Sequence, residues 1–183
     1  MFEPAIRLLL DTAFGLITYA FLLRFAMQWL RAPFRNPLGQ AVVALTDWAV
    51  KPARKLIPGY RGLDGSTLVL AWLSQFAWHC AIALLLGTGG FDGSTWATFA
   101  LLACVDLIKA LIWLLIIVVI VQAILSWVAP DGPLSGTLNA MTFRFLAPIR
   151  RVVPPVGGTL DLSPLILILP LRWLEGAVLM VFR

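Results

Sequence analysis

Four long apolar stretches, separated by shorter polar segments, dominate the hydrophobic pattern of the chain. They cover approximately residues 10–30, 68–86, 107–128 and 163–182. Each is close to the roughly 20 apolar residues that a helix needs to cross a bilayer. The third stretch is already apolar near Trp96, but Asp106 and Lys109 indicate that its first turns lie at the interface. The pattern therefore predicts an all-α integral membrane protein with four transmembrane helices.

A shorter helical pattern follows the first and the third apolar stretch. It runs over about residues 37–51 and again over about residues 133–147, and we expect Pro52 and Pro148 to end the two helices. At three to four turns, these segments are too short to cross a bilayer. One side of each is apolar, which is typical of an amphipathic helix that lies in the membrane interface.

The two halves of the chain carry the same motif around this short helix. The first copy reads Asn36-Pro37-Leu38, Pro52-Ala53-Arg54-Lys55-Leu56-Ile57-Pro58 and Asp64-Gly65-Ser66, and the second reads Gly132-Pro133-Leu134, Pro148-Ile149-Arg150-Arg151-Val152-Val153-Pro154 and Asp161-Leu162-Ser163. The spacing between copies is nearly constant, since 148 − 52 = 96 and 161 − 64 = 97. The chain is therefore a tandem duplication, with repeats over about residues 1–95 and 96–183. Each repeat contains two spans, so both enter the membrane in the same direction as parallel repeats.

Composition and charge agree with a membrane protein and suggest its orientation. The chain is 61% hydrophobic and 13% charged, with a mean hydropathy of +0.93, whereas soluble domains carry about 25% charged residues. The basic residues gather in the two repeated loops, and the connection over residues 87–98 has no Lys or Arg. The positive-inside rule then predicts that both loops are cytoplasmic and that both termini lie outside.

The repeated loops carry most of the polar residues that we consider candidates for contact with lipid or a partner. Asn36 stands at an N-cap position with Pro37 in the first turn, and Asp47 and Lys51 are spaced as an i,i+4 pair. The full candidate set is Asn36, Pro37, Asp47, Lys51, Arg54, Lys55, Asp64, Arg144, Arg150, Arg151 and Asp161. Binding to anionic headgroups is one interpretation, and docking of a membrane-protein partner or a second copy is the other. Nucleic acid is not expected, because the basic residues are few and lie against the membrane.

A second candidate set lies within the spans, where ionisable residues often mark function. It consists of Arg24, Gln75, His79, Arg172 and Glu175. We expect Arg24 to extend to the headgroups. Arg172 and Glu175 share a helix face near mid-membrane and should form an ion pair. The pair could stabilise the structure, form part of an ion or proton path, or contact a partner's helix. As a hypothesis, Gln75 and Arg172 face a central pseudo-two-fold axis, since they occupy equivalent repeat positions.

The sequence offers no catalytic, metal or cofactor site. There is no nucleophile paired with a base, no phosphate loop, and His79 is the only histidine. The cysteines, Cys80 and Cys104, have no metal-binding or redox spacing. We therefore expect a protein without catalytic activity.

The motif of the two loops resembles that of the YggT (YlmG) family of small integral membrane proteins, and the resemblance covers essentially the whole chain. It implies a bacterial inner-membrane protein whose relatives are linked to cell division and nucleoid placement, to osmotic tolerance and potassium uptake, and in plastids to haem attachment on a b-type cytochrome. The second copy departs from the family pattern at two positions. Gly132 stands where the first copy has Asn36, and Phe143 stands where it has Asp47. We expect a membrane scaffold or assembly factor; the alternative is a small oligomeric channel or transport accessory.

Overall fold

The computed structural model describes residues 2–57, 59, 64–87, 92–153 and 161–181, and these residues form helices without any strand. The helices are α1 (Phe2–Trp29), α2 (Pro37–Leu56), α3 (Gly65–Leu86), α4 (Gly93–Val128), α5 (Ser135–Val152) and α6 (Ser163–Val181). Pro58 and Pro154 of the repeated motif, and both ends of the chain, lie outside the described residues.

Four of these helices, α1, α3, α4 and α6, are long and apolar enough to cross a membrane, as the sequence predicted. Three of them, α1, α3 and α4, start earlier than the expected residues 10, 68 and 107. Helix α4 begins at Gly93, close to the Trp96 from which the stretch is already apolar. It is capped by the Asp92 carboxylate, which accepts a hydrogen bond from the Thr95 amide at 3.0 Å. Asp106 and Lys109 do not interrupt it, because Lys109 donates to Asp106 at 2.7 Å within the helix.

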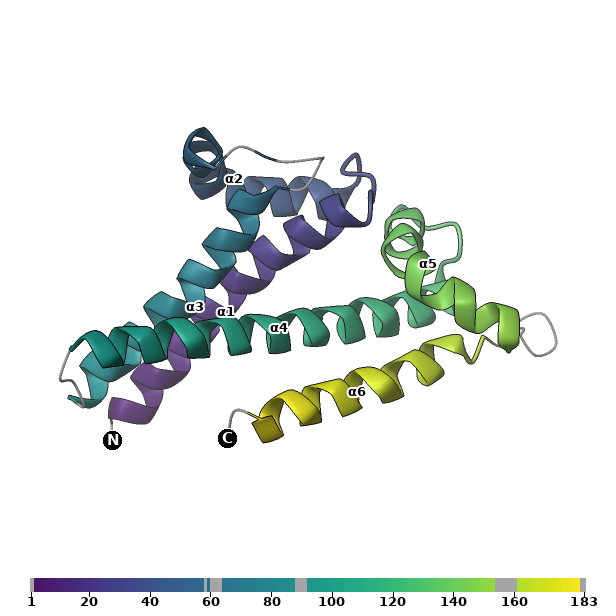
Figure 1. The fold of residues 1–183 in the computed structure, drawn as a ribbon. Helices are drawn as coiled ribbons and strands as arrows, with labels where there is room; N and C mark the ends of the chain where they lie inside the picture. The colour runs from purple at the N-terminus through teal and green to yellow at the C-terminus, as the bar shows by residue number, and fades with distance from the viewer. Residues whose placement is uncertain (1, 58, 60–63, 88–91, 154–160, 182–183) are drawn as a thin grey trace.

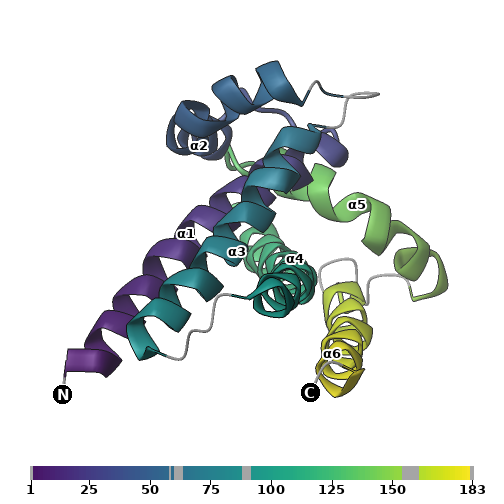
Figure 2. The same cartoon turned by 60° about the vertical axis from the view of Figure 1, so that its left-hand side comes forward.

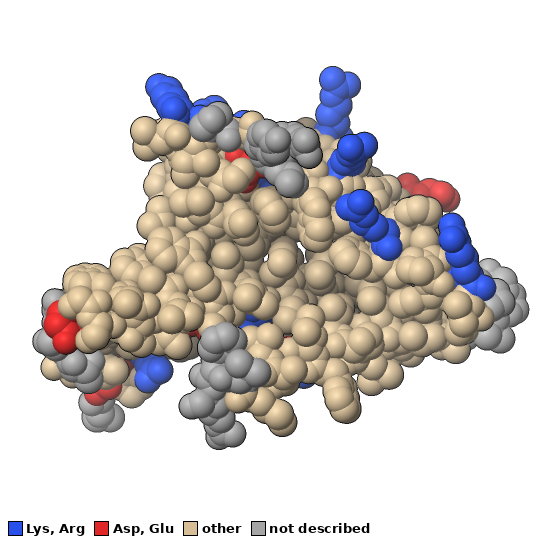
Figure 3. Space-filling view, viewed as in Figure 1, with Lys and Arg blue, Asp and Glu red and all other residues tan. Residues whose placement is uncertain are grey.

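The helices are arranged as two helical hairpins with their short helices at the same end. Helices α1 and α3 lie side by side, α4 crosses them, and α6 runs along α4 (Figures 1 and 2). Helices α2 and α5 lie at the ends of the spans on one side of the molecule (Figure 1). Arginine and lysine side chains are concentrated along this side, while the visible surface of the spans is almost free of charge (Figure 3).

Both short helices continue past the proline that was expected to end them. Helix α2 contains Pro52 and ends at Leu56, and α5 contains Pro148 and ends at Val152. A proline removes one backbone hydrogen bond, but the next turn of each helix still closes, as the Ile57 amide bonds to the Ala53 carbonyl at 2.9 Å. The expected ends at residues 51 and 147 are therefore wrong by one turn.

The N-terminal ends of the two short helices differ because their capping residues differ. Asn36 caps α2 as predicted, with its side chain accepting from the Gly39 amide at 2.8 Å and Pro37 in the first turn. Gly132 has no side chain to do this, so the chain forms a turn and α5 begins only at Ser135. The Asn36 turn is tight, since a Cβ on Gly39 would lie 2.5 Å from the Phe34 carbonyl oxygen.

The main buried core lies where α1, α3 and α4 meet the two short helices. Its most buried members include Leu22 and Met27 of α1, Val50 of α2 and Met141 of α5. At the opposite end of the spans, residues 3–9 of α1 are all exposed. The short helices are thus held firmly against the spans.

Helix α1 ends in an unusual way at Arg31. The Ala32 amide bonds back to the Met27 carbonyl at 2.8 Å and the Arg31 amide to the Gln28 carbonyl at 3.1 Å, which is the hydrogen-bond pattern of a Schellman motif. Arg31 has φ 54° in this motif, the only positive φ of a non-glycine residue in the described backbone. Glycine normally occupies such a position, and a side chain there costs about 1 kcal/mol.

Candidate functional site

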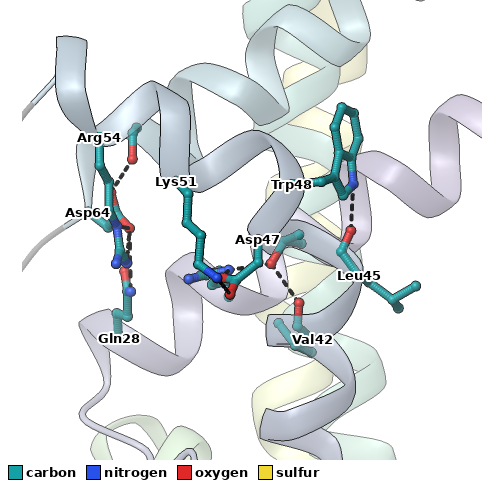
Figure 4. A network of polar contacts seen from close by, with 11 residues as sticks. Gln28, Val42, Leu45, Asp47, Trp48, Lys51, Arg54 and Asp64 are labelled. Atoms are coloured by element: carbon teal, nitrogen blue, oxygen red, sulfur yellow. Dashed lines mark hydrogen bonds and ion pairs between the residues drawn. The ribbon is translucent and has the colours of Figure 1, made fainter.

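The repeated Arg and Asp of the two motifs form the same ion pair in both repeats. Arg54 Nε donates to Asp64 Oδ2 at 2.7 Å (Figure 4), and Arg150 Nε donates to Asp161 Oδ2 at 2.8 Å. Each pair joins the C-terminal turn of a short helix to the start of the next span. These four residues of the first candidate set therefore serve the architecture of the repeat.

Both aspartates are held in their charged form by these contacts. Burial raises the pKa of Asp64, but hydrogen bonds from Arg54 and Ser66 outweigh it, and the resulting pKa lies below the ordinary carboxyl value. Burial likewise raises the pKa of Asp161, and the hydrogen bonds from Ser163 and Arg150 again leave it below that value. The last turns of α2 and α5 are thus fixed by ionised carboxylates at neutral pH.

Arg24 does not extend to the surface, contrary to expectation. Its side chain lies under α2 with only 4% of the residue exposed. Nη1 donates to Thr46 Oγ1 at 2.6 Å and to Asp47 Oδ1 at 2.8 Å, and Lys51 Nζ lies 2.8 Å from the other oxygen of Asp47. Hydrogen bonds from Lys51, and then from Arg24, hold the pKa of Asp47 below its ordinary value. The polar network thus couples α1 to α2.

In the second repeat the corresponding contact between span and short helix involves only uncharged residues. Gln122 stands five residues before Trp127, as Arg24 stands five residues before Trp29 (127 − 122 = 29 − 24). The hydroxyl of Thr142, which matches Thr46, donates to Gln122 Oε1 at 2.7 Å. Because the arginine is replaced by a neutral residue, no carboxylate is needed, and Phe143 stands in place of Asp47. This signal was present in the sequence, but it required the two spans to be aligned.

Asn36 also connects the two repeats. Besides capping α2, its side-chain amide donates to Thr137 Oγ1 of α5 at 2.7 Å, a buried contact. Neither the cap nor this bridge leaves the side chain available to an external partner. Asn36 and Pro37 are therefore placed as structural elements of the loop.

The other basic residues of the loops remain on the surface. Lys55, Arg144 and Arg151 are exposed. Arg144 and Arg151 line a groove of about 900 Å³ between the end of α1 and one side of α5. Arg31, which the sequence did not single out, lines the same groove from α1.

Two polar residues of the second candidate set, Gln75 and Glu175, line a second groove that lies among the spans. It measures about 320 Å³ and is lined by residues of α1, α3, α4 and α6, among them Asp11, Gln75, Asp106 and Glu175. His79 hydrogen-bonds Asp106 at 2.9 Å. The sequence did not reveal this groove, because its lining comes from four helices that are far apart in the chain.

Arg172 and Glu175 form the expected pair, with Nη1 2.8 Å from Oε2. The Trp113 indole N–H donates to the other Glu175 oxygen at 2.7 Å, and the Arg172 guanidinium lies over the Trp113 ring at 4.6 Å. The Arg172 side chain is 53% exposed. Gln75 donates to Thr18 of α1 at 3.0 Å and lines the same groove as Glu175. A common axis for Gln75 and Arg172 stays a prediction.

Comparison with known proteins agrees with this two-repeat architecture. A family model described as CCB3/YggT matches residues 4–85 and, a second time, residues 101–182. The chain belongs to the CCB3/YggT family. Each match begins in one span and ends in the next, so the CCB3/YggT unit is the span–short helix–span repeat described above.

Bacterial relatives within the CCB3/YggT family match over nearly their whole length. A Vibrio alginolyticus protein named for the proC 3′ region is 35% identical over 90% of this chain and 88% of its own. A Pseudomonas aeruginosa relative is 35% identical over 93% and 86%. YggT of Escherichia coli K12 is 34% identical over 96% and 89%. No solved structure matches the chain.

Proposed function

We propose that the protein is a non-catalytic scaffold or assembly factor of the bacterial inner membrane. In this proposal the side that carries α2 and α5 faces the cytoplasm, in keeping with its basic charge. The observation that carries the proposal is the pair of short helices, which present large apolar side chains outward from a firmly held base. Trp48 and Leu45 of α2 and Val152 of α5 are among the exposed apolar residues.

The rigidity of these helices supports a role in binding rather than in anchoring alone. Ion pairs at Arg54–Asp64 and Arg150–Asp161 fix their C-terminal turns, and Asn36 ties the two repeats together. A simple lipid anchor does not require such fixation, whereas a docking surface benefits from being preorganised. The surface would gather a membrane-protein partner at the membrane interface.

Photo-crosslinking in native membranes tests this proposal. Probes would replace Trp48 and Val152, with a control probe at Leu84 of α3, whose exposure of 66% is close to the 69% of Trp48. A defined protein captured from both short helices but not from Leu84 supports the scaffold. Asp64→Asn, which releases the last turn of α2, should reduce capture at Trp48. Products that contain only this chain would instead indicate a homo-oligomer and contradict a partner scaffold.

A second candidate, an oligomeric channel or transport accessory, is favoured by the polar groove near Asp106 and Glu175. Carboxylates at span depth are costly unless they serve packing or transport. Potassium flux into liposomes that contain the purified protein tests it. Flux that is lost in Glu175→Gln but kept in Asp131→Asn, an exposed residue outside the groove, would support this candidate, and liposomes without flux would exclude it.

A further inference from the structure

The groove between α1 and α5 is lined by arginine side chains that make no ion pair with any described residue. Three arginines line it, Arg31 from α1 and Arg144 and Arg151 from α5, and its lining contains no carboxylate. Other basic residues near the short helices are neutralised, since Arg24 and Lys51 share Asp47 and Arg54 is paired with Asp64. Within the described residues, none of the three groove arginines makes an ion pair.

The backbone at Arg31 indicates that its guanidinium has a use. The position has φ 54°, where glycine is favoured. A glycine would end α1 with less strain, so what arginine adds here is its side chain. Strained residues of this kind gather at functional sites. Arg31 therefore adds a cation to the lining of the groove at some cost to the stability of the fold.

The residues that line the groove suit an amphiphile rather than a soluble anion. Arg144 and Arg151 are seven residues apart and so lie on one face of α5. Trp29, the last residue of α1, and Phe143 also line the groove and are partly exposed. Tryptophan at the end of a span is typical of the headgroup region. The three cations thus lie beside an apolar wall that ends at Trp29, where a span of this kind is expected to meet the lipid headgroups.

The first repeat does not carry the same pair of cations. Position 144 matches Trp48 (144 − 96 = 48), and 151 matches Lys55 (151 − 96 = 55), which leaves one cation where the second repeat has two. The pair Arg144 and Arg151 is therefore specific to the second repeat.

We propose that this groove binds the phosphate group of one anionic phospholipid per chain, with Arg31, Arg144 and Arg151 as its ligands. Basic pockets at the ends of transmembrane helices are suited to such headgroups, and bidentate guanidinium contacts favour phosphate. This site goes beyond the proposed scaffold role and is independent of it, because it is defined on the purified chain without a partner.

Native mass spectrometry of the detergent-solubilised protein tests the site. The protein would be titrated with phosphatidylglycerol and, separately, with phosphatidylcholine of the same acyl chains. We expect one retained phosphatidylglycerol per chain and much weaker retention of phosphatidylcholine. Each guanidinium contributes about fivefold in affinity, so Arg144→Gln with Arg151→Gln should weaken phosphatidylglycerol binding about 25-fold.

Matched variants separate a specific site from general surface charge. Arg35→Gln with Lys55→Gln removes the same charge from exposed residues outside the groove and should change binding less than twofold. Arg31→Gly should weaken binding about fivefold while thermal stability is kept or increased, which shows that folding is intact. Equal losses in the two double variants, or full binding by the groove variant, would overturn the site. Competition by soluble glycerol phosphate as effective as by the lipid would overturn its assignment to a lipid.

Discussion

The replacement Asp47→Phe copies into the first repeat the residue that the second repeat has at Phe143. It leaves the Arg24 guanidinium buried with only its contact to Thr46. Removing one partner of a buried ion pair costs about 3–5 kcal/mol. Because the Asp47 side chain is 24% exposed and Thr46 is retained, we expect a loss at or below the lower end, about 2–3 kcal/mol.

Adding Arg24→Gln should rescue most of this loss, because the pair then matches Gln122 and Phe143. Thr46 would donate to the new glutamine as Thr142 donates to Gln122. We expect the double variant to lie within about 1 kcal/mol of the parent, so that Arg24→Gln recovers about 1–2 kcal/mol of the loss caused by Asp47→Phe.

Unfolding in mixed micelles by sodium dodecyl sulfate, followed by tryptophan fluorescence, would measure these free energies. Lys51→Met provides a control, since Lys51 is 74% exposed and its ion pair should contribute less than about 1 kcal/mol. A double variant as unstable as Asp47→Phe alone would refute the reasoning, as it would show that the uncompensated charge is not the cause of the loss.

Three further predictions use the same assay. Asn36→Ala removes the cap of α2 and its bond to α5 and should cost about 1–2 kcal/mol; an unchanged midpoint would contradict that bridging role. Gly39→Ala should destabilise by more than about 1 kcal/mol, because its Cβ would lie 2.5 Å from a backbone oxygen, whereas Gly136→Ala meets nothing within 4 Å and should be neutral. Asp64 and Asp161 have lower pKa values when folded than when unfolded, so they stabilise the fold fully above the ordinary carboxyl range near 4 and lose this effect as pH falls through their folded pKa values. Asp64→Asn should therefore reduce the acid dependence of the unfolding midpoint, and an unaltered pH profile would argue against it.

Local signals predicted which segments form helices. The lengths of the apolar stretches predicted four spans, and Asn36 with Pro37 located the start of α2. The prolines misled about where the short helices end, because Pro52 and Pro148 each remove one hydrogen bond while ion pairs at the following turn keep the helix folded.

Long-range partners could not be obtained in this way. Arg24 and Asp47 are 23 residues apart, and their contact depends on α2 folding back over α1. The joint replacement by Gln122 and Phe143 in the second repeat was the one sequence signal for it. The αL conformation of Arg31 had no local signal at all, because glycine is the residue that usually marks it.

The unequal helix lengths in the second repeat have a consequence for the surrounding lipid. Helix α6 has 19 residues and spans about 28 Å, while α4 has 36 residues and spans about 54 Å. A hydrocarbon core of about 30 Å suits α6 nearly upright, but it accommodates α4 only if that helix is inclined or projects beyond the core. A change in bilayer thickness should therefore be absorbed mainly by the tilt of α4, and with it by the angle at which one repeat meets the other.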